Sequence, residues 1–118
     1  MTSTEQDCDK LIRELGGTVI TFGRKGQRTK NTHGIPDRLY FVRGKMVWFE
    51  IKSPNDYLSD EQIVFLDRVQ GYGGIAGCGN VGDLRELLQA TVHPPPALQF
   101  GREQVLRYST RQKALRGA

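Results

Sequence analysis

Apolar and polar residues follow two different spacings along this chain, one typical of helices and one typical of strands. Apolar residues at helical spacing near the N-terminus are followed by Gly16 and Gly17, which end a helix. Runs rich in β-branched and aromatic residues indicate short strands, separated by clusters of Gly, Pro, Asn and Asp. The predicted elements are a helix at 4–15, strands at 17–22, 37–42 and 46–52, a helix from Ser59 to about Gln70, a glycine-rich strand within 71–80 and a helix at 81–90. This order predicts an α/β fold in which helices flank a sheet.

Three charged residues, Asp37, Glu50 and Lys52, stand among the apolar residues of the two central strands. Strand alternation places Glu50 and Lys52 on one face. Asp37 faces Glu50 if the connecting turn is Arg43–Gly44, and it faces Lys52 if the turn is Gly44–Lys45. Both two-residue turns put the three charges at one end of one face, whereas a three-residue turn would separate them.

Two carboxylates at directly opposed strand positions have Cβ atoms about 4.5–5.5 Å apart. They repel each other unless a cation lies between them. Their hard oxygen atoms suit Mg²⁺, so a metal site is one interpretation. The other is a salt bridge at the sheet edge, in which Asp37 or Glu50 pairs with Lys52. The basic segment that leads into Asp37 favours a site that receives phosphate.

Length and composition indicate a single soluble globular domain, since the chain has 118 residues, 37% hydrophobic and 25% charged. No apolar run reaches membrane-spanning length, and the polar start has no secretory signal pattern. We therefore expect no membrane association and a cytoplasmic location, in a bacterial cell or a phage-infected host. Cys8 and Cys78 lie far apart without nearby metal-ligand motifs, which favours reduced thiols over a disulfide or a zinc site.

Positive charge is concentrated in two segments. Residues 91–118 carry five basic side chains and one acid, Glu103, so the net charge of +4 originates there. The segment Gly23–His33 contains no acid and four basic residues, Arg24, Lys25, Arg28 and Lys30. Two such segments on a small domain indicate a polyanionic partner, although solvated loops can have the same composition.

The sequence HPPP, His93 to Pro96, breaks regular structure and predicts the end of the compact body. We therefore expect a body at residues 1–92 and a basic C-terminal extension at 93–118. The extension is weakly amphipathic, a pattern compatible with a helix, an arm or a partly disordered tail.

Three motifs, GIPDRLYF, WFEIKS and LSDEQIVFLDRVQGYGG, follow one another between Gly34 and Gly74. Together they resemble the PD-(D/E)xK nuclease superfamily and, within it, the virus-type replication-repair nuclease (VRR-NUC) domain. The resemblance covers the chain from about Glu5 to Ala90, and it assigns the body at 1–92 to such a domain. It implies a restriction-endonuclease-like core with a central mixed β-sheet flanked by α-helices.

The resemblance also implies phosphodiester hydrolysis with Mg²⁺ or Mn²⁺. Pro36 and Asp37 correspond to the PD pair, and Glu50, Ile51 and Lys52 to the ExK triplet. Asp37, Glu50 and the Ile51 backbone carbonyl would hold the metal. Lys52 would orient or help to deprotonate the attacking water and offset the charge of the phosphate.

Two further residues each have two interpretations. Gln62 matches a glutamine that in related nucleases contacts the active site or a metal-bound water, but Ser59 and Gln62 also form an S-x-x-Q capping box. Glu5 lies on the apolar stripe of the first helix, where related nucleases often add a carboxylate to the metal site. An acid near a helix N-terminus also suits the helix dipole, and Asp9 is the alternative carboxylate one turn later.

The function implied by the resemblance is a DNA endonuclease selective for branched or junction DNA, similar to Holliday-junction resolvases and active as a homodimer in replication, repair or recombination. A domain this small has little surface for reading bases, which favours recognition of DNA structure over DNA sequence. The alternatives are a restriction-type or general DNA nuclease on the same fold, an RNA substrate, and a non-catalytic DNA-binding module. The residues expected to bind the DNA backbone are Arg24, Lys25, Arg28, Lys30 and His33.

Overall fold

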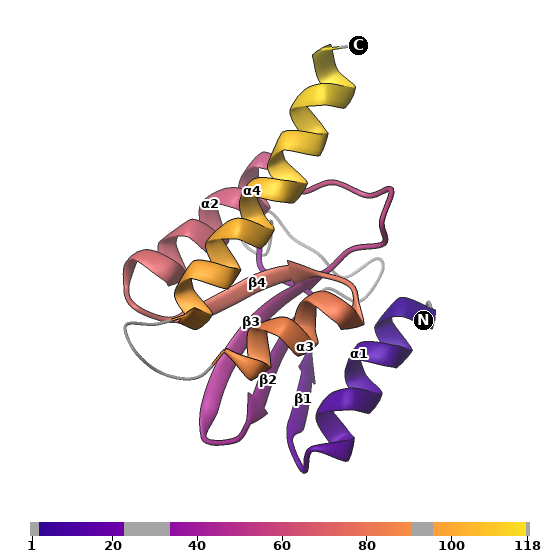
Figure 1. Ribbon diagram of the computed structural model, residues 1–118, viewed down its shortest axis with the longest axis vertical. Coiled ribbons are helices and arrows are strands. Elements are labelled where there is room, and N and C mark those ends of the chain that lie inside the picture. The colour runs from indigo at the N-terminus through magenta and orange to yellow at the C-terminus, as the bar shows by residue number, and fades with distance from the viewer. Residues whose placement is uncertain (1–2, 23–33, 91–95, 118) are drawn as a thin grey trace.

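The structure of the chain, a computed structural model, describes residues 3–22, 34–90 and 96–117 (Figure 1). In chain order the elements are α1 (Ser3–Glu14), β1 (Thr18–Thr21), β2 (Arg38–Val42), β3 (Lys45–Ile51), α2 (Asp60–Gly71), β4 (Ile75–Gly79), α3 (Val81–Gln89) and α4 (Pro96–Gly117). The strands form one sheet in the order β1-β2-β3-β4. The β1–β2 and β2–β3 pairs are antiparallel and the β3–β4 pair is parallel. The predicted α/β fold with a mixed sheet and flanking helices is confirmed.

Both faces of the sheet are covered because apolar residues point alternately to either side of the strands. Val47 and Phe49 of β3 are fully buried in one cluster with Cys8 and Ile12 of α1 and with leucines of α3. On the other side, buried residues of β4 pack with Leu66 of α2 and with α4. Figure 1 shows α1 and α3 on one side of the sheet and α2 and α4 on the other.

The turn between β2 and β3 has two residues, Arg43 and Gly44, with φ angles of 54° and 73°. Positive φ at both positions is typical of a type I′ turn, whose twist suits a hairpin. In the resulting register Val42 pairs with Lys45 and Arg38 pairs with Phe49. The register with a Gly44–Lys45 turn is therefore wrong, and Asp37 lies opposite Glu50.

The C-terminal segment corrects one expectation. We expected His93–Pro96 to end the compact body, but α4 begins at Pro96 and packs on the outer edge of β4. Its Ala97, Val105 and Tyr108 are buried, and Gln104 is completely so. The expectation is wrong because β4 is an edge strand that α4 covers. Residues 93–95 lie outside the described ranges, and the assignment of the nuclease domain to residues 1–92 stays a prediction.

In the part of the chain that the structure describes, no helix has the length and apolar character needed to cross a membrane.

Candidate active site

A buried carboxylate, Glu50, is the centre of the candidate site. Only 1% of Glu50 is exposed. Its Oε2 accepts a hydrogen bond from the backbone N–H of Asp37 at 3.3 Å, and its Oε1 accepts one from Nε2 of Gln62 at 2.8 Å. The beginning of β2 and the beginning of α2 therefore meet at one carboxyl group of β3.

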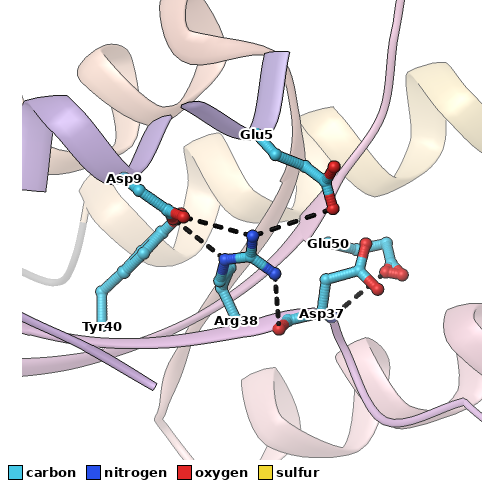
Figure 2. Close-up of polar contacts among 6 residues, drawn as sticks. All are labelled: Glu5, Asp9, Asp37, Arg38, Tyr40 and Glu50. Carbon is cyan, nitrogen blue, oxygen red and sulfur yellow. Dashed lines mark hydrogen bonds and ion pairs between the residues drawn. The ribbon is translucent and has the colours of Figure 1, made fainter. Parts of the chain in front are cut away.

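Asp37 lies immediately before β2 and is half-buried. In addition to the bond from its N–H to Glu50, its carbonyl oxygen accepts hydrogen bonds from the backbone N–H of Phe22 at 2.9 Å and from Nη1 of Arg38 at 3.2 Å. Both ends of this residue's backbone are thus fixed. Figure 2 shows the Asp37 carboxylate on the same side as that of Glu50.

Gln62 belongs to the predicted capping box and also contacts Glu50. Its Oε1 accepts from the Ser59 N–H at 2.8 Å, and the Ser59 hydroxyl accepts from the Gln62 N–H at 3.2 Å, which completes the capping box at the start of α2. The remaining end of the amide, Nε2, donates to Glu50. The capping box thus orients the amide so that its donor meets the buried carboxylate.

Lys52 and Ile51 stand at the end of β3, beside Glu50. The Lys52 N–H donates to the Gly79 carbonyl at 2.8 Å, which extends the β3–β4 pairing past the strand end. Lys52 is half-buried, and alternation of the extended chain places it on the face of Glu50. Backbone pairing thus brings Asp37 to Glu50, and alternation places Lys52 near the same end of the sheet; their joint action as a site stays a prediction.

A second polar network lies on the α1 side of the same sheet end (Figure 2). Arg38 is 2% exposed and binds both carboxylate oxygens of Asp9, through Nε at 2.9 Å and Nη2 at 3.2 Å. Tyr40 donates its hydroxyl to the same Asp9 carboxylate at 2.8 Å. Burial and this bond to Asp9 raise the pKa of Tyr40. For Arg38, burial acts to lower the pKa, but the hydrogen bond and charge of Asp9 outweigh it and the pKa is raised.

The two carboxylates expected from the first helix have different surroundings. Asp9 is 1% exposed and is bound by Arg38 and Tyr40, so it anchors α1 to the sheet. Glu5 lies with its Oε1 3.7 Å from Nη2 of Arg38, and its side chain is 27% exposed. In Figure 2 its carboxylate points past Arg38 towards the side where Asp37 and Glu50 lie.

Arg38 is the residue of this region that sequence reasoning missed. Its signal was present, because strand alternation puts Arg38 on the same face as Tyr40 and Val42, against the first helix. A buried arginine needs an acidic partner, and Asp9 lies on the inner side of that helix.

The oxygen atoms at this sheet end suit a hard divalent cation, since carboxylates and backbone carbonyls are the ligands of Mg²⁺ and Mn²⁺. Within residues 3–22, 34–90 and 96–117 no three His, Cys, Asp or Glu residues form a group that could hold a metal ion by themselves. Asp37 and Glu50 are carboxylates that meet at this sheet end, and the Ile51 carbonyl as a third ligand stays a prediction. The expected DNA-binding residues Arg24, Lys25, Arg28, Lys30 and His33 lie outside the described ranges.

No protein-family model matches this chain, and no curated protein matches it. Among solved structures, a VRR_NUC domain matches with a TM-score of 0.59 and 20% sequence identity, over 74% of this chain and 91% of that chain. Hjc, a Holliday junction resolvase from Archaeoglobus fulgidus, matches with a TM-score of 0.49 and 21% identity, over 66% of this chain and 65% of its own. The resemblance seen in the sequence is confirmed at the level of the fold, and this chain has the fold of a VRR_NUC domain.

Proposed function

We propose that this protein is a metal-dependent nuclease that hydrolyses phosphodiester bonds in DNA. The observation that carries the proposal is the placement of Asp37 opposite the buried Glu50, with Lys52 on the same face. Two carboxylates placed in this way repel each other, which costs free energy unless a cation lies between them. The fold of a VRR_NUC domain supports the same reaction.

Asp37, Glu50 and the Ile51 carbonyl would hold Mg²⁺ or Mn²⁺, and Glu5, which lies beside Arg38 on the α1 side, is the further carboxylate that we propose. Such a metal lowers the pKa of a bound water and stabilises charge on phosphate oxygens. Two donors, the Gln62 amide and the Asp37 N–H, bind the two oxygen atoms of Glu50. They would fix the orientation of the carboxylate towards the metal.

Lys52 and Gln62 have separate roles in this proposal. Lys52 would orient the attacking water or help to remove its proton, and its positive charge would offset that of the phosphate. Gln62 would keep Oε1 of Glu50 in place through its 2.8 Å bond. Glu50 lies in β3 and Asp37 directly precedes β2, so the pairing of the two strands brings the two residues together.

The substrate that we propose is branched or junction DNA, cut by a homodimer that places one site on each of two strands. The basic segment at 24–33 would bind the phosphate backbone, and the basic residues of α4 would extend that contact. A domain of this size offers little surface for reading base edges, so the shape of the DNA is the more accessible feature.

The test is incubation of the wild-type protein with a four-way junction, a 5′ flap, single strands, linear duplex and the matching RNAs, each with Mg²⁺, Mn²⁺ or EDTA. We expect cleavage of the junction with either metal and none with EDTA. Cutting of linear duplex at equal rates would indicate a general nuclease instead. Junction binding without cleavage under any metal would indicate a DNA-binding module and refute the nuclease.

The matching variants are Asp37→Asn, Glu50→Gln and Lys52→Ala, with the exposed Glu86→Gln of α3 as control. We expect each site variant to cut about 100-fold more slowly or worse, because Asp37→Asn and Glu50→Gln remove a proposed metal ligand and Lys52→Ala removes the charge that would offset the phosphate. Junction affinity should stay near that of wild type, and Glu86→Gln should cut normally. Site variants that cut at the wild-type rate would contradict the assignment.

A further inference from the structure

Arg38 contacts three groups that come from two parts of the chain. Its Nε and Nη2 bind Asp9 at 2.9 and 3.2 Å, its Nη2 lies 3.7 Å from Glu5, and its Nη1 donates to the Asp37 carbonyl at 3.2 Å. Figure 2 shows the guanidinium between α1 and the start of β2. The planar fork of an arginine can serve such divergent partners, whereas the ammonium of a lysine cannot.

The side chain of Arg38 points to the α1 side of the sheet, because it pairs with Phe49 of that core. Glu50, the next residue along β3, points to the opposite side and bonds to α2. The Asp37 backbone is the point where the two sides meet, since its N–H binds Glu50 and its carbonyl binds Arg38. A substitution of Arg38 would therefore alter the Asp37 backbone directly, and Glu50 through its bond to the Asp37 N–H.

We propose that Arg38 is a positioning residue of the candidate metal site, which fixes the backbone of Asp37 and directs the Glu5 carboxylate towards that end of the sheet. This inference rests on the proposed function, because it assigns Arg38 a task at that site. Arg38 itself touches neither metal nor DNA. Asp9 balances its charge and ties it to α1, so that the first helix and β2 form one support for the site.

A merely structural Arg38 would join α1 to the sheet and nothing more. The two roles predict different metal affinities for the folded variants. Groups that support metal ligands change metal affinity by about 10- to 100-fold when they are removed, whereas a remote loss of stability leaves the affinity of the folded protein unchanged. The readout is therefore Mn²⁺ binding to the DNA-free protein, measured by calorimetry.

Three variants and one control separate the roles. Arg38→Lys keeps a buried cation for Asp9 but cannot serve all three partners. The triple variant Asp9→Leu, Arg38→Met, Tyr40→Phe replaces the whole network with apolar groups, an exchange that often preserves stability. Glu5→Gln changes a partly exposed side chain and leaves the core intact. The control, Tyr40→Phe, removes one hydrogen bond of the same network and leaves the contacts of Arg38 in place.

We expect Arg38→Lys and the triple variant to bind Mn²⁺ about 10- to 100-fold more weakly than wild type, and Glu5→Gln to be weakened as well. Tyr40→Phe should melt at a lower temperature yet bind Mn²⁺ as wild type does. Folded Arg38→Lys or triple variants with wild-type Mn²⁺ affinity would overturn the inference. Wild-type affinity in Glu5→Gln would overturn its second half. If neither Arg38 variant folds, the network is structural and the inference fails.

Wild-type behaviour separates this inference from the proposed function. A wild-type protein that neither binds Mn²⁺ nor cuts any substrate refutes the nuclease, and the inference with it. A wild-type protein that binds Mn²⁺ and cuts DNA, alongside variants of unchanged affinity, refutes only the role of Arg38.

Discussion

Gln62 serves two partners with the two ends of one amide group. Its oxygen completes the capping box of α2 and its nitrogen donates to Glu50. A side chain of this kind couples the start of a helix to a buried charge, so the position of α2 and the orientation of the carboxylate depend on each other. Substitutions can separate the two tasks.

Gln62→Glu keeps an oxygen for the Ser59 N–H, because Glu is as good as Gln in a capping box. It replaces the donor to Glu50 with a second carboxylate, which repels it. We expect slower cleavage, by about 10-fold or more, with the helical circular dichroism signal retained. The cleavage rate on the junction and the far-ultraviolet spectrum measure the two effects.

Ser59→Ala is the matched control for this prediction. It removes the acceptor of the Gln62 N–H and leaves the bond from Gln62 to Glu50 available. We expect a loss of about 1 kcal/mol in the free energy of unfolding and a cleavage rate near that of wild type. Equal cleavage by Gln62→Glu and wild type would show that the bond to Glu50 has no role in the reaction.

The meeting of Asp37 with Glu50 could be predicted from the sequence as one of two registers, because alternation fixes faces and the turn fixes pairing. The sequence could not decide between the two registers, because the observed turn needs a positive φ at Arg43, which arginine rarely adopts. Asp9 illustrates another limit. Its spacing on the first helix fitted a site carboxylate, but its actual partner, Arg38, depends on how that helix packs against the sheet.

At the scale of elements, the outer edge of β4 is closed by side chains from two helices. Gln104 of α4 accepts from the Cys78 N–H at 3.1 Å, and Gln70 of α2 donates to the Ala76 carbonyl at 2.9 Å. The second end of the Gln104 amide donates to the Asp83 carbonyl at 2.8 Å, which ties α3 to α4. A glycine, Gly101, allows this close approach, because a Cβ there would collide with the Ala76 carbonyl.

Gly101→Ala tests this packing. We expect the added methyl group to push α4 away from β4 and to lower the free energy of unfolding by about 1–3 kcal/mol, the usual cost of overpacking. The midpoint of urea unfolding should fall with little change in the slope of the transition.

Gly71→Ala is the control, since a Cβ at this last residue of α2 meets no atom within 4 Å. It should be neutral, or stabilising by up to about 1 kcal/mol, because alanine favours the helix over glycine. Equal midpoints for Gly101→Ala and Gly71→Ala would contradict a close α4–β4 contact.

The same packing explains why the place of α4 was missed. Its inward side includes Gly101 and Gln104, which add nothing to a pattern of apolar residues at helical spacing. The elements up to residue 90 other than β4 were predicted within one residue, because their inward sides are mostly Leu, Ile, Val and Phe. The glycine-rich stretch 71–80 gave only an approximate place for β4, which begins at Ile75.

At the scale of the whole molecule, burial on both faces of the sheet encloses two thiols and two tyrosines of the described residues, all of which ionise at alkaline pH. Burial, followed by the charge of Asp9, raises the pKa of the Cys8 thiol from 9.0 to about 12. Burial is also the main cause that raises the pKa of Tyr40, Cys78 and Tyr108. Each of these groups is neutral in the folded protein well above the pH at which it ionises in the unfolded chain.

Stability should therefore fall on the alkaline side. An acid whose pKa is raised by folding holds its proton in the folded state while the unfolded chain has lost it, so the free energy of unfolding decreases as pH rises above the unfolded value. For the thiols this decrease begins near pH 9.0 and for the tyrosines near pH 10.0. Urea midpoints measured from pH 8 upwards should fall progressively with pH in this range.

Tyr40→Phe provides the comparison for this prediction. The variant loses the bond to Asp9 and should be less stable at every pH, but its midpoint should fall less steeply above pH 10.0 because one titrating group is gone. A flat profile for wild type from pH 8 to 11 would show that these groups are not buried in solution.

The covered edge of β4 also limits how copies of this chain can associate. Adding a strand from another chain to a sheet requires unpaired backbone N–H and C=O groups along the outermost strand. The outward N–H of Cys78 and the outward carbonyl of Ala76 already bind Gln104 and Gln70. Two protomers of the proposed dimer therefore cannot share a continuous sheet through β4, and their two sites must be set apart by contacts made elsewhere on the surface.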